Sequence, residues 1–149
     1  MKPSNILNAL GIILIAFGVI MLSPIAVAIM EREYSSILPF VIASLSSVTL
    51  GLFLQKQGGF SRNFDNISRN EGLLTVCLAW VVTAAMGAIP YLFYGLHPLD
   101  AYFESVSGIT TTGATILIDF SLYPKDFFFW RSLNQWLGGM GIIVLFVAI

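Results

Sequence analysis

The chain has 149 residues, of which 57% are hydrophobic and 10% are charged, and its formal net charge is −1. Soluble domains carry about 25% charged residues, so this composition excludes an ordinary water-soluble domain and indicates an integral membrane protein. Cys77 is the only cysteine, which excludes disulfide frameworks and cysteine-based metal sites within the chain.

Three stretches lack Lys, Arg, Asp and Glu, and each exceeds the roughly 20 residues that a helix needs to cross the hydrocarbon core. They cover residues 3–30, 34–55 and 72–99. In the first stretch Pro24 removes a backbone donor, so we expect the helix to kink or end there. A secretory signal is the alternative for this stretch, but its apolar core, residues 6–22, is longer than a signal core of about 7 to 15 residues, and further spans follow.

The first two spans predict a transmembrane hairpin over residues 1–56. Small residues in the second span allow close helix approach, namely Ser44, Ser46, Ser47 and Gly51. A polar linker, residues 57–70, separates the hairpin from the rest of the chain. Loops rich in Lys and Arg stay on the cytoplasmic side, and this places the N-terminus and the linker there, through Lys2, Lys56, Arg62 and Arg69.

The third span, about residues 72–95, is followed by a short helix whose two ends are marked in the sequence. Pro98 suits a first helical position, Asp100 complements the positive end of the helix dipole, and Gly108 can stop the helix in a left-handed conformation. A helix over residues 98–108 reaches roughly 15 Å, about half of a hydrocarbon core, so it cannot cross. His97 precedes this helix, where starting the helix is preferred over binding a metal.

A fourth apolar run, residues 127–149, has to start on the outer side from which the short helix enters. The chain between them must therefore return outward, which gives the order span, re-entrant half-helix, extended return, span. This pore-loop repeat covers residues 71–149, and we expect its last span to be truncated because no polar flank follows it. The alternative is an amphipathic helix lying on the outer leaflet, with a solvated loop after it.

The polar run at the end of the half-helix, residues 110–115, predicts an ion path. A half-helix that points inward places its partly negative C-terminal end near mid-membrane, which stabilises a cation. An extended strand can direct successive carbonyls at one axis, and these come from Thr110, Thr111, Thr112, Gly113 and Ala114. Successive carbonyls align only if the backbone alternates between right-handed and left-handed conformations. Glycine at 113 suits this alternation because it adopts a positive φ at little cost.

Other polar and small residues near the run have two readings each. Asp100 and Glu104 lie one helical turn apart, and they either attract cations at the pore mouth or tie the loop structurally. Asn134 and Gln135 lie within the last span, where we expect hydrogen bonds to the pore loop because unpaired polar groups in lipid are costly. The glycines at 138, 139 and 141 favour close packing over a direct role in gating.

Two segments together resemble the bacterial Trk potassium-uptake membrane subunits. Residues 101–115, AYFESVSGITTTGAT, resemble the first pore loop of that family, and residues 129–145 resemble its next helix. The resemblance covers the whole chain and implies an all-α integral membrane protein, a helical hairpin followed by the first of four pore repeats. It implies that K⁺ is the transported ion and binds at Thr111 and Thr112, that Gly113 and Ala114 complete the filter, and that Thr110 flanks it. Thr115 replaces the second glycine of the potassium-channel signature Thr-Val-Gly-Tyr-Gly.

The same resemblance implies the partners and the location. They are the three remaining pore repeats, a second copy of the full-length subunit in a homodimer, a cytoplasmic nucleotide-binding regulatory subunit, and the lipid bilayer of the bacterial cytoplasmic (inner) membrane, with no nucleic acid. We expect no cofactor besides the transported K⁺ and no enzymatic activity. The alternative function is a small non-conducting membrane protein that assembles with other transporter subunits.

Overall fold

The computed structural model describes residues 3–59 and 68–148, with the side chains of residue 69 and of residues 142–148 left aside. The regular secondary structure of the described ranges is helical, without β-strands. The non-helical segment after α5 is called the strand below because of its path, and it pairs with no sheet. In chain order the elements are α1 Pro3–Ile20, α2 Ser23–Met30, the 3₁₀ helix η1 Tyr34–Ser36, α3 Ile37–Gln57, α4 Arg69–Phe93, α5 Pro98–Ile109, the 3₁₀ helix η2 Phe120–Leu122, and α6 Lys125–Ala148. The predicted all-α fold is confirmed.

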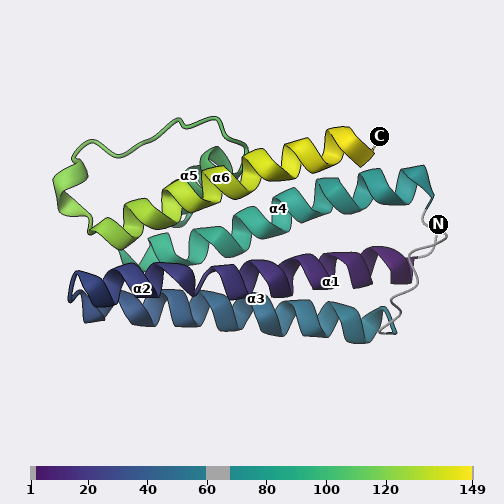
Figure 1. Cartoon of the computed structure of the whole chain (residues 1–149), viewed down its shortest axis with the longest axis horizontal. Coiled ribbons are helices and arrows are strands. Elements are labelled where there is room, and N and C mark those ends of the chain that lie inside the picture. Colours follow the sequence, from purple (N-terminus) through teal and green to yellow (C-terminus); the bar gives the residue numbers. More distant parts are fainter. Residues whose placement is uncertain (1–2, 60–67, 149) are drawn as a thin grey trace.

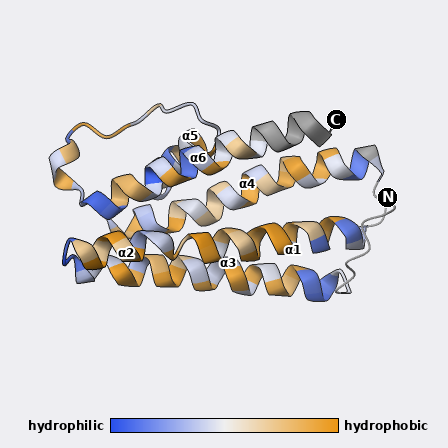
Figure 2. Ribbon diagram, in the orientation of Figure 1, coloured by the Kyte–Doolittle hydropathy of each residue, from blue (hydrophilic) through white to orange (hydrophobic). Residues whose placement is uncertain are grey.

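The long helices lie side by side as a bundle, with α1, α2 and α3 on one side and α4 and α6 on the other (Figure 1). Apolar residues run along their length, and polar residues gather at the helix ends (Figure 2). Three helical segments are long and apolar enough to cross a membrane, namely Pro3–Met30, Tyr34–Gln57 and Asn70–Phe93. They coincide with the three predicted spans.

Local sequence signals set the helix ends. The first span breaks at Met21 and Leu22, and Pro24 lies in the first turn of α2, where a backbone donor has no helical partner to lose. The third span begins three residues earlier than predicted, because Ser68 and Glu71 form a capping box. The Ser68 hydroxyl accepts from the Glu71 amide at 3.4 Å, and the Ser68 amide donates to the Glu71 carboxylate at 3.2 Å. Most of the predicted linker, residues 60–67, lies outside the described residues.

The hairpin of α1 and α3 is held by small residues at the helix contact. The Ser44 hydroxyl donates to the Gly18 carbonyl at 2.7 Å, and the Ser47 hydroxyl donates to the Leu14 carbonyl at 2.8 Å. Gly51 approaches so closely that a Cβ there would lie 2.7 Å from the Gly11 carbonyl oxygen. The close approach predicted for these residues is confirmed, whereas the Ser46 hydroxyl bonds within its own helix, to the Ala43 carbonyl, and takes no part.

We predict that Gly51→Ala destabilises this hairpin, because the added methyl meets backbone and overpacking costs about 1–3 kcal/mol. The control is Gly72→Ala in α4, where a Cβ meets nothing within 4 Å and alanine gains up to about 1 kcal/mol of helix propensity. Thermal unfolding of the purified chain in detergent should therefore show a lower Tm for the first variant and an equal or higher Tm for the second. Equal shifts in both variants would contradict the contact.

The hairpin and the repeat share one core around Trp130 of α6. This side chain is wholly buried, its ring lies 5.6 Å from that of Phe17 and 6.2 Å from that of Phe40, and its indole nitrogen donates to the Gly87 carbonyl at 3.1 Å. At the end of the bundle where α6 begins, Lys125 pairs with Glu31 at 2.9 Å. The repeat is therefore positioned by the hairpin along the bundle and at the end where α6 begins.

The chain path through the repeat is re-entrant. From the end of α4, α5 turns back into the bundle and ends about midway along it, and the following segment returns to the end where α6 starts (Figure 1). The buried face of α5 consists of Ala101, Glu104, Ser105, Ser107, Gly108 and Ile109. A helix with this much buried surface between α4 and α6 does not lie on a leaflet, so the alternative of a surface helix is wrong.

The predicted stop of the half-helix at Gly108 is also wrong. Gly108 is helical, and α5 continues to Ile109 with Thr110 as its C-cap. The glycine is needed there for packing, since a Cβ would lie 3.3 Å from the Asn134 Cβ on α6. The left-handed conformation falls instead on Thr111, three residues later, with φ of 60°.

Candidate functional site: the strand after the half-helix

The backbone after α5 alternates in hand from residue to residue. Thr110 has φ of −84°, Thr111 of 60° and Gly113 of 75°, and these two are the positive values of the described strand. The positive φ predicted for Gly113 is confirmed, and alternating hands are what a backbone needs to turn successive carbonyls toward one side. A β-branched residue in the left-handed region costs about 1–2 kcal/mol, so Thr111 is a strained position that the sequence did not reveal.

Hydrogen bonds to the end of α5 hold this conformation. The Thr111 amide donates to the Gly108 carbonyl at 2.9 Å, and the Gly113 amide donates to the Ser107 carbonyl at 3.2 Å. The Thr110 hydroxyl donates to the Val106 carbonyl at 2.7 Å and lies 2.9 Å from the Thr112 hydroxyl. The strain at Thr111 is therefore maintained by its neighbours, as strained backbone at functional sites usually is.

The five carbonyls predicted to face an ion fall into two groups. In the described part of the chain no donor reaches the carbonyl oxygens of Thr110, Thr111 and Thr112. The Gly113 carbonyl accepts from the Arg131 Nη2 at 3.2 Å. The Ala114 carbonyl accepts from the same nitrogen at 3.1 Å and from the Ser107 hydroxyl at 2.5 Å. The first group is free for a ligand, whereas Ala114 is engaged twice by the protein.

Glu104 is wholly buried beneath the strand. Its Oε1 accepts from the Thr115 hydroxyl at 2.6 Å and from the Ile116 amide at 2.8 Å, and its Oε2 accepts from the Arg131 Nε at 2.9 Å. Of the two roles that the sequence left open for this acid, these contacts favour tying the loop. A carboxylate that is buried and paired presents no net charge to ions in solution.

Asp100 differs from Glu104 in its surroundings. It lies in the first turn of α5 and is half-buried, where its charge complements the helix dipole. Among the described residues no hydrogen bond or ion pair involves it. Attraction of cations by Asp100 stays a prediction.

Two polar residues of α6, Asn134 and Gln135, are expected from the sequence to form hydrogen bonds with the pore loop. Asn134 is wholly buried, and neither atom of its amide forms a hydrogen bond with the described residues of the pore loop, so its predicted bond to that loop is wrong. It lies against the glycine faces of α4 and α5 instead, 3.1 Å from where a Gly87 Cβ would stand. The Gln135 amide nitrogen does lie beside the strand, 3.4 Å from the Cβ position of Gly113.

Close packing explains the glycine at 138. A Cβ there would lie 1.8 Å from the Ile109 carbonyl oxygen, so the last turn of α5 rests directly on the backbone of α6. Gly138 is thirteen residues into α6, or about 20 Å along it, which puts the end of the half-helix deep in the bundle. At the neighbouring Gly139 a Cβ would meet only the Thr111 Cγ2, at 3.6 Å.

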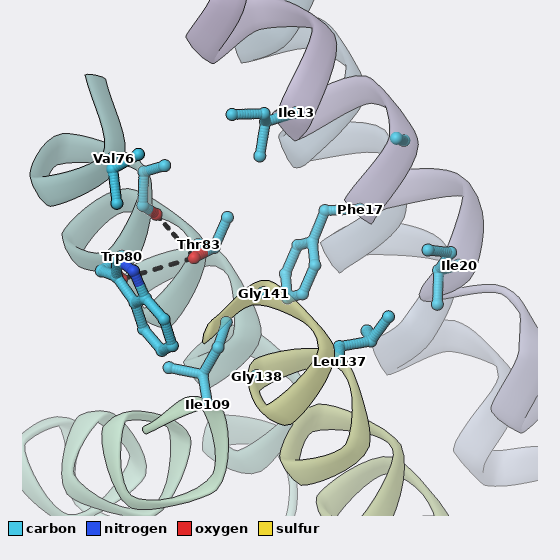
Figure 3. Close-up of a pocket in the computed structure, with 12 residues that line it drawn as sticks. Ile13, Phe17, Ile20, Val76, Trp80, Thr83, Ile109, Leu137, Gly138 and Gly141 are labelled. Carbon is cyan, nitrogen blue, oxygen red and sulfur yellow. Dashed lines mark hydrogen bonds between the residues drawn. The ribbon is translucent and has the colours of Figure 1, made fainter. Parts of the chain in front are cut away.

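A cavity of about 470 Å³ lies beside this contact, between α1, α4, α6 and the end of α5 (Figure 3). Apolar side chains dominate its wall, among them Ile13, Phe17 and Leu137. The Thr83 hydroxyl on the wall donates to the Ala79 carbonyl of its own helix at 2.6 Å. The cavity therefore offers an ion few oxygens to replace its water, and the free carbonyls after α5 are the candidate site.

Comparisons with known proteins agree with this geometry. The family model described as TrkH, cation transport protein, matches residues 35–149. The Trk system potassium uptake protein TrkH of Vibrio parahaemolyticus is 36% identical over 100% of this chain and 31% of its own length, and that of Escherichia coli K12 is 37% identical over 97% of this chain and 30% of its own. The crystal structure of the potassium transporter TrkH from Vibrio parahaemolyticus matches with a TM-score of 0.91 at 36% identity, covering 99% of this chain and 32% of that one. The chain thus spans less than a third of the length of these relatives.

Proposed function

Because the chain belongs to the TrkH family of cation transport proteins, we propose that it is the N-terminal part of a potassium-transporting subunit in which residues 110–114 form one quarter of the ion filter. The observation that carries the proposal is a strand of alternating hand, with unpaired carbonyls, at the inner end of a re-entrant helix. Potassium as the ion rests on the relatives, which are named potassium uptake proteins.

The chemistry is replacement of the ion's hydration shell by backbone oxygens. The free carbonyls of Thr111 and Thr112 are the proposed K⁺ ligands, with Thr110 flanking them on the inner side and Gly113 on the outer side. The negative end of the α5 dipole points at the same place and adds the equivalent of about half an elementary charge. The Ala114 carbonyl, which accepts two hydrogen bonds, serves chiefly to anchor the strand.

One strand supplies oxygens from one side only, so the proposal requires three further repeats around the ion. Apolar side chains on the outer part of the return segment support this requirement. Ile118 is 99% exposed and Leu122 is 74% exposed, and additional repeats would cover such residues. From the resemblance of residues 101–115 and 129–145 to Trk subunits, we also propose a homodimer of the full-length subunit, a cytoplasmic nucleotide-binding regulatory subunit, and a place in the bacterial inner membrane with the N-terminus in the cytoplasm.

Two transport measurements test the proposal. The full-length subunit, expressed in bacteria that lack their own potassium uptake, should restore growth at low external K⁺. This chain alone should be purified and reconstituted into K⁺-loaded vesicles. These vesicles should release no more K⁺ than K⁺-loaded vesicles without protein. Autonomous flux through the chain would refute the idea of a quarter filter. A full-length subunit that transports nothing but co-purifies with other transporter subunits would favour the non-conducting assembly protein.

A further inference from the structure

Arg131 is an unusual residue for its position. It lies six residues into α6, roughly 9 Å from the start of that helix, and its side chain is 17% exposed. Charged residues within transmembrane helices are costly, and they commonly mark function when they are present. The hydrogen-bond partners of this guanidinium indicate why a charged side chain is present within the helix.

Arg131 donates two hydrogen bonds to the strand and one to a buried side chain in the core. Its Nη2 donates to the Gly113 and Ala114 carbonyls, and its Nε donates to the buried Glu104. The guanidinium is planar, so fixing Nε on a wholly buried carboxylate also fixes where Nη2 lies. The same carboxylate holds Thr115 and Ile116 with its other oxygen. The outer half of the strand is thus held from both sides by one ion pair.

We propose that Arg131 is a specificity-determining residue of the filter: held by Glu104, it fixes the Gly113 and Ala114 carbonyls in place and so prevents the strand from closing around an ion smaller than K⁺. The inference rests on the proposed function of the strand. Arg131 acts by positioning, since it contacts the carbonyls and not the ion. Because Glu104 neutralises its charge, the brace adds rigidity without repelling a cation.

The decisive variant is Arg131→Lys in the full-length subunit. Lysine keeps the positive charge and can pair with Glu104, but its single ammonium cannot also reach both carbonyls in the fixed geometry of a guanidinium. We expect the ratio of K⁺ to Na⁺ flux, measured in vesicles, to fall on the order of tenfold, the factor that corresponds to about one charge-assisted hydrogen bond. A residue with a purely structural role would change the amount of folded protein and leave this ratio unchanged.

A second variant covers the case in which Arg131→Lys fails to accumulate. The double variant Glu104→Gln with Arg131→Gln keeps the shape of the Glu104 side chain and leaves no unpaired buried charge. It also removes the guanidinium, so the flux ratio should fall in the same way. The control is Lys125→Gln, which breaks the exposed ion pair with Glu31 at the start of the same helix and should leave the ratio unchanged.

The outcomes distinguish failure of the role proposed for Arg131 from failure of the proposed filter function. An unchanged flux ratio in both Arg131 variants would overturn the role of Arg131, provided that a bulky residue at Gly113 still abolishes transport. If the Gly113 substitution also left transport intact, the filter assignment itself would fail. A lower ratio in both Arg131 variants, with a normal ratio in Lys125→Gln, supports the role of Arg131.

Discussion

Replacing Gly113 by valine in the full-length subunit should abolish potassium uptake while the helices remain folded. Gly113 has φ of 75°, where a side chain costs about 1–2 kcal/mol and a β-branched one is a clear outlier. Relief of that strain rotates the adjoining peptide planes, so the carbonyls of Thr112 and Gly113 would leave the positions that the proposed filter requires. Rubidium or potassium uptake per unit of membrane-inserted protein measures the effect.

Gly95→Val provides the matched control for this substitution. Gly95 has φ of 87° and lies in the turn between α4 and α5, with nothing within 4 Å of its Cβ position. The strain added there is similar, so this variant should lose comparable stability and keep its uptake per folded molecule. Equal loss of uptake in both variants would show that strain alone, and not the place of Gly113 in the strand, causes the defect.

Gly138→Ala should be the most damaging single methyl in the repeat. The added Cβ would stand 1.8 Å from the Ile109 carbonyl oxygen, and the surrounding atoms are backbone of α5, which cannot rotate away. Overpacking of this kind costs about 3 kcal/mol or more, and separating α5 from α6 also displaces the strand that follows Ile109. We expect a marked fall in Tm of the purified chain and loss of uptake in the full-length subunit.

The adjacent residue supplies the comparison. At Gly139 the nearest atom to a Cβ is the Thr111 Cγ2 at 3.6 Å, which is ordinary van der Waals contact. Gly139→Ala should therefore be neutral or gain up to about 1 kcal/mol from helix propensity. The test compares the thermal unfolding of the Gly138→Ala and Gly139→Ala variants. Equal stability of the two would exclude the close contact between α5 and α6.

Features with a local cause were predictable from the sequence. Pro98 fixed the start of the half-helix, and the polar run after it marked the return strand, so the expected range of 98–108 differs from α5 by one residue. The capping box at Ser68 was equally local, and the spacing Ser-x-x-Glu could have placed the start of α4 correctly. The stop at Gly108 failed because a glycine that permits close packing looks the same in a sequence as one that ends a helix.

Features that depend on two distant elements were not predictable. Arg131 reaches the carbonyl of a residue 18 positions earlier and a carboxylate 27 positions earlier, and no periodicity connects such positions. The same holds for Glu104, whose role turned on whether it is exposed or buried. The strain at Thr111 also had no signal, because β-branched residues such as threonine are seldom found in a left-handed conformation.

The contacts of the α1 and α3 hairpin have a consequence for the order of assembly during synthesis. The partners Leu14, Gly18, Ser44 and Ser47 all precede residue 59, so the hairpin can close as soon as its second helix has left the ribosome. The segment after α5 has no such independence, since Arg131 and Gly138, which it contacts, are synthesised after it. Growing chains fold from the N-terminus, and the closed hairpin then presents Phe17 and Phe40 as a prepared surface on which Trp130 docks. The hairpin is therefore available as a packing surface before the segment after α5, which gains its contacts only once Arg131 and Gly138 have been synthesised.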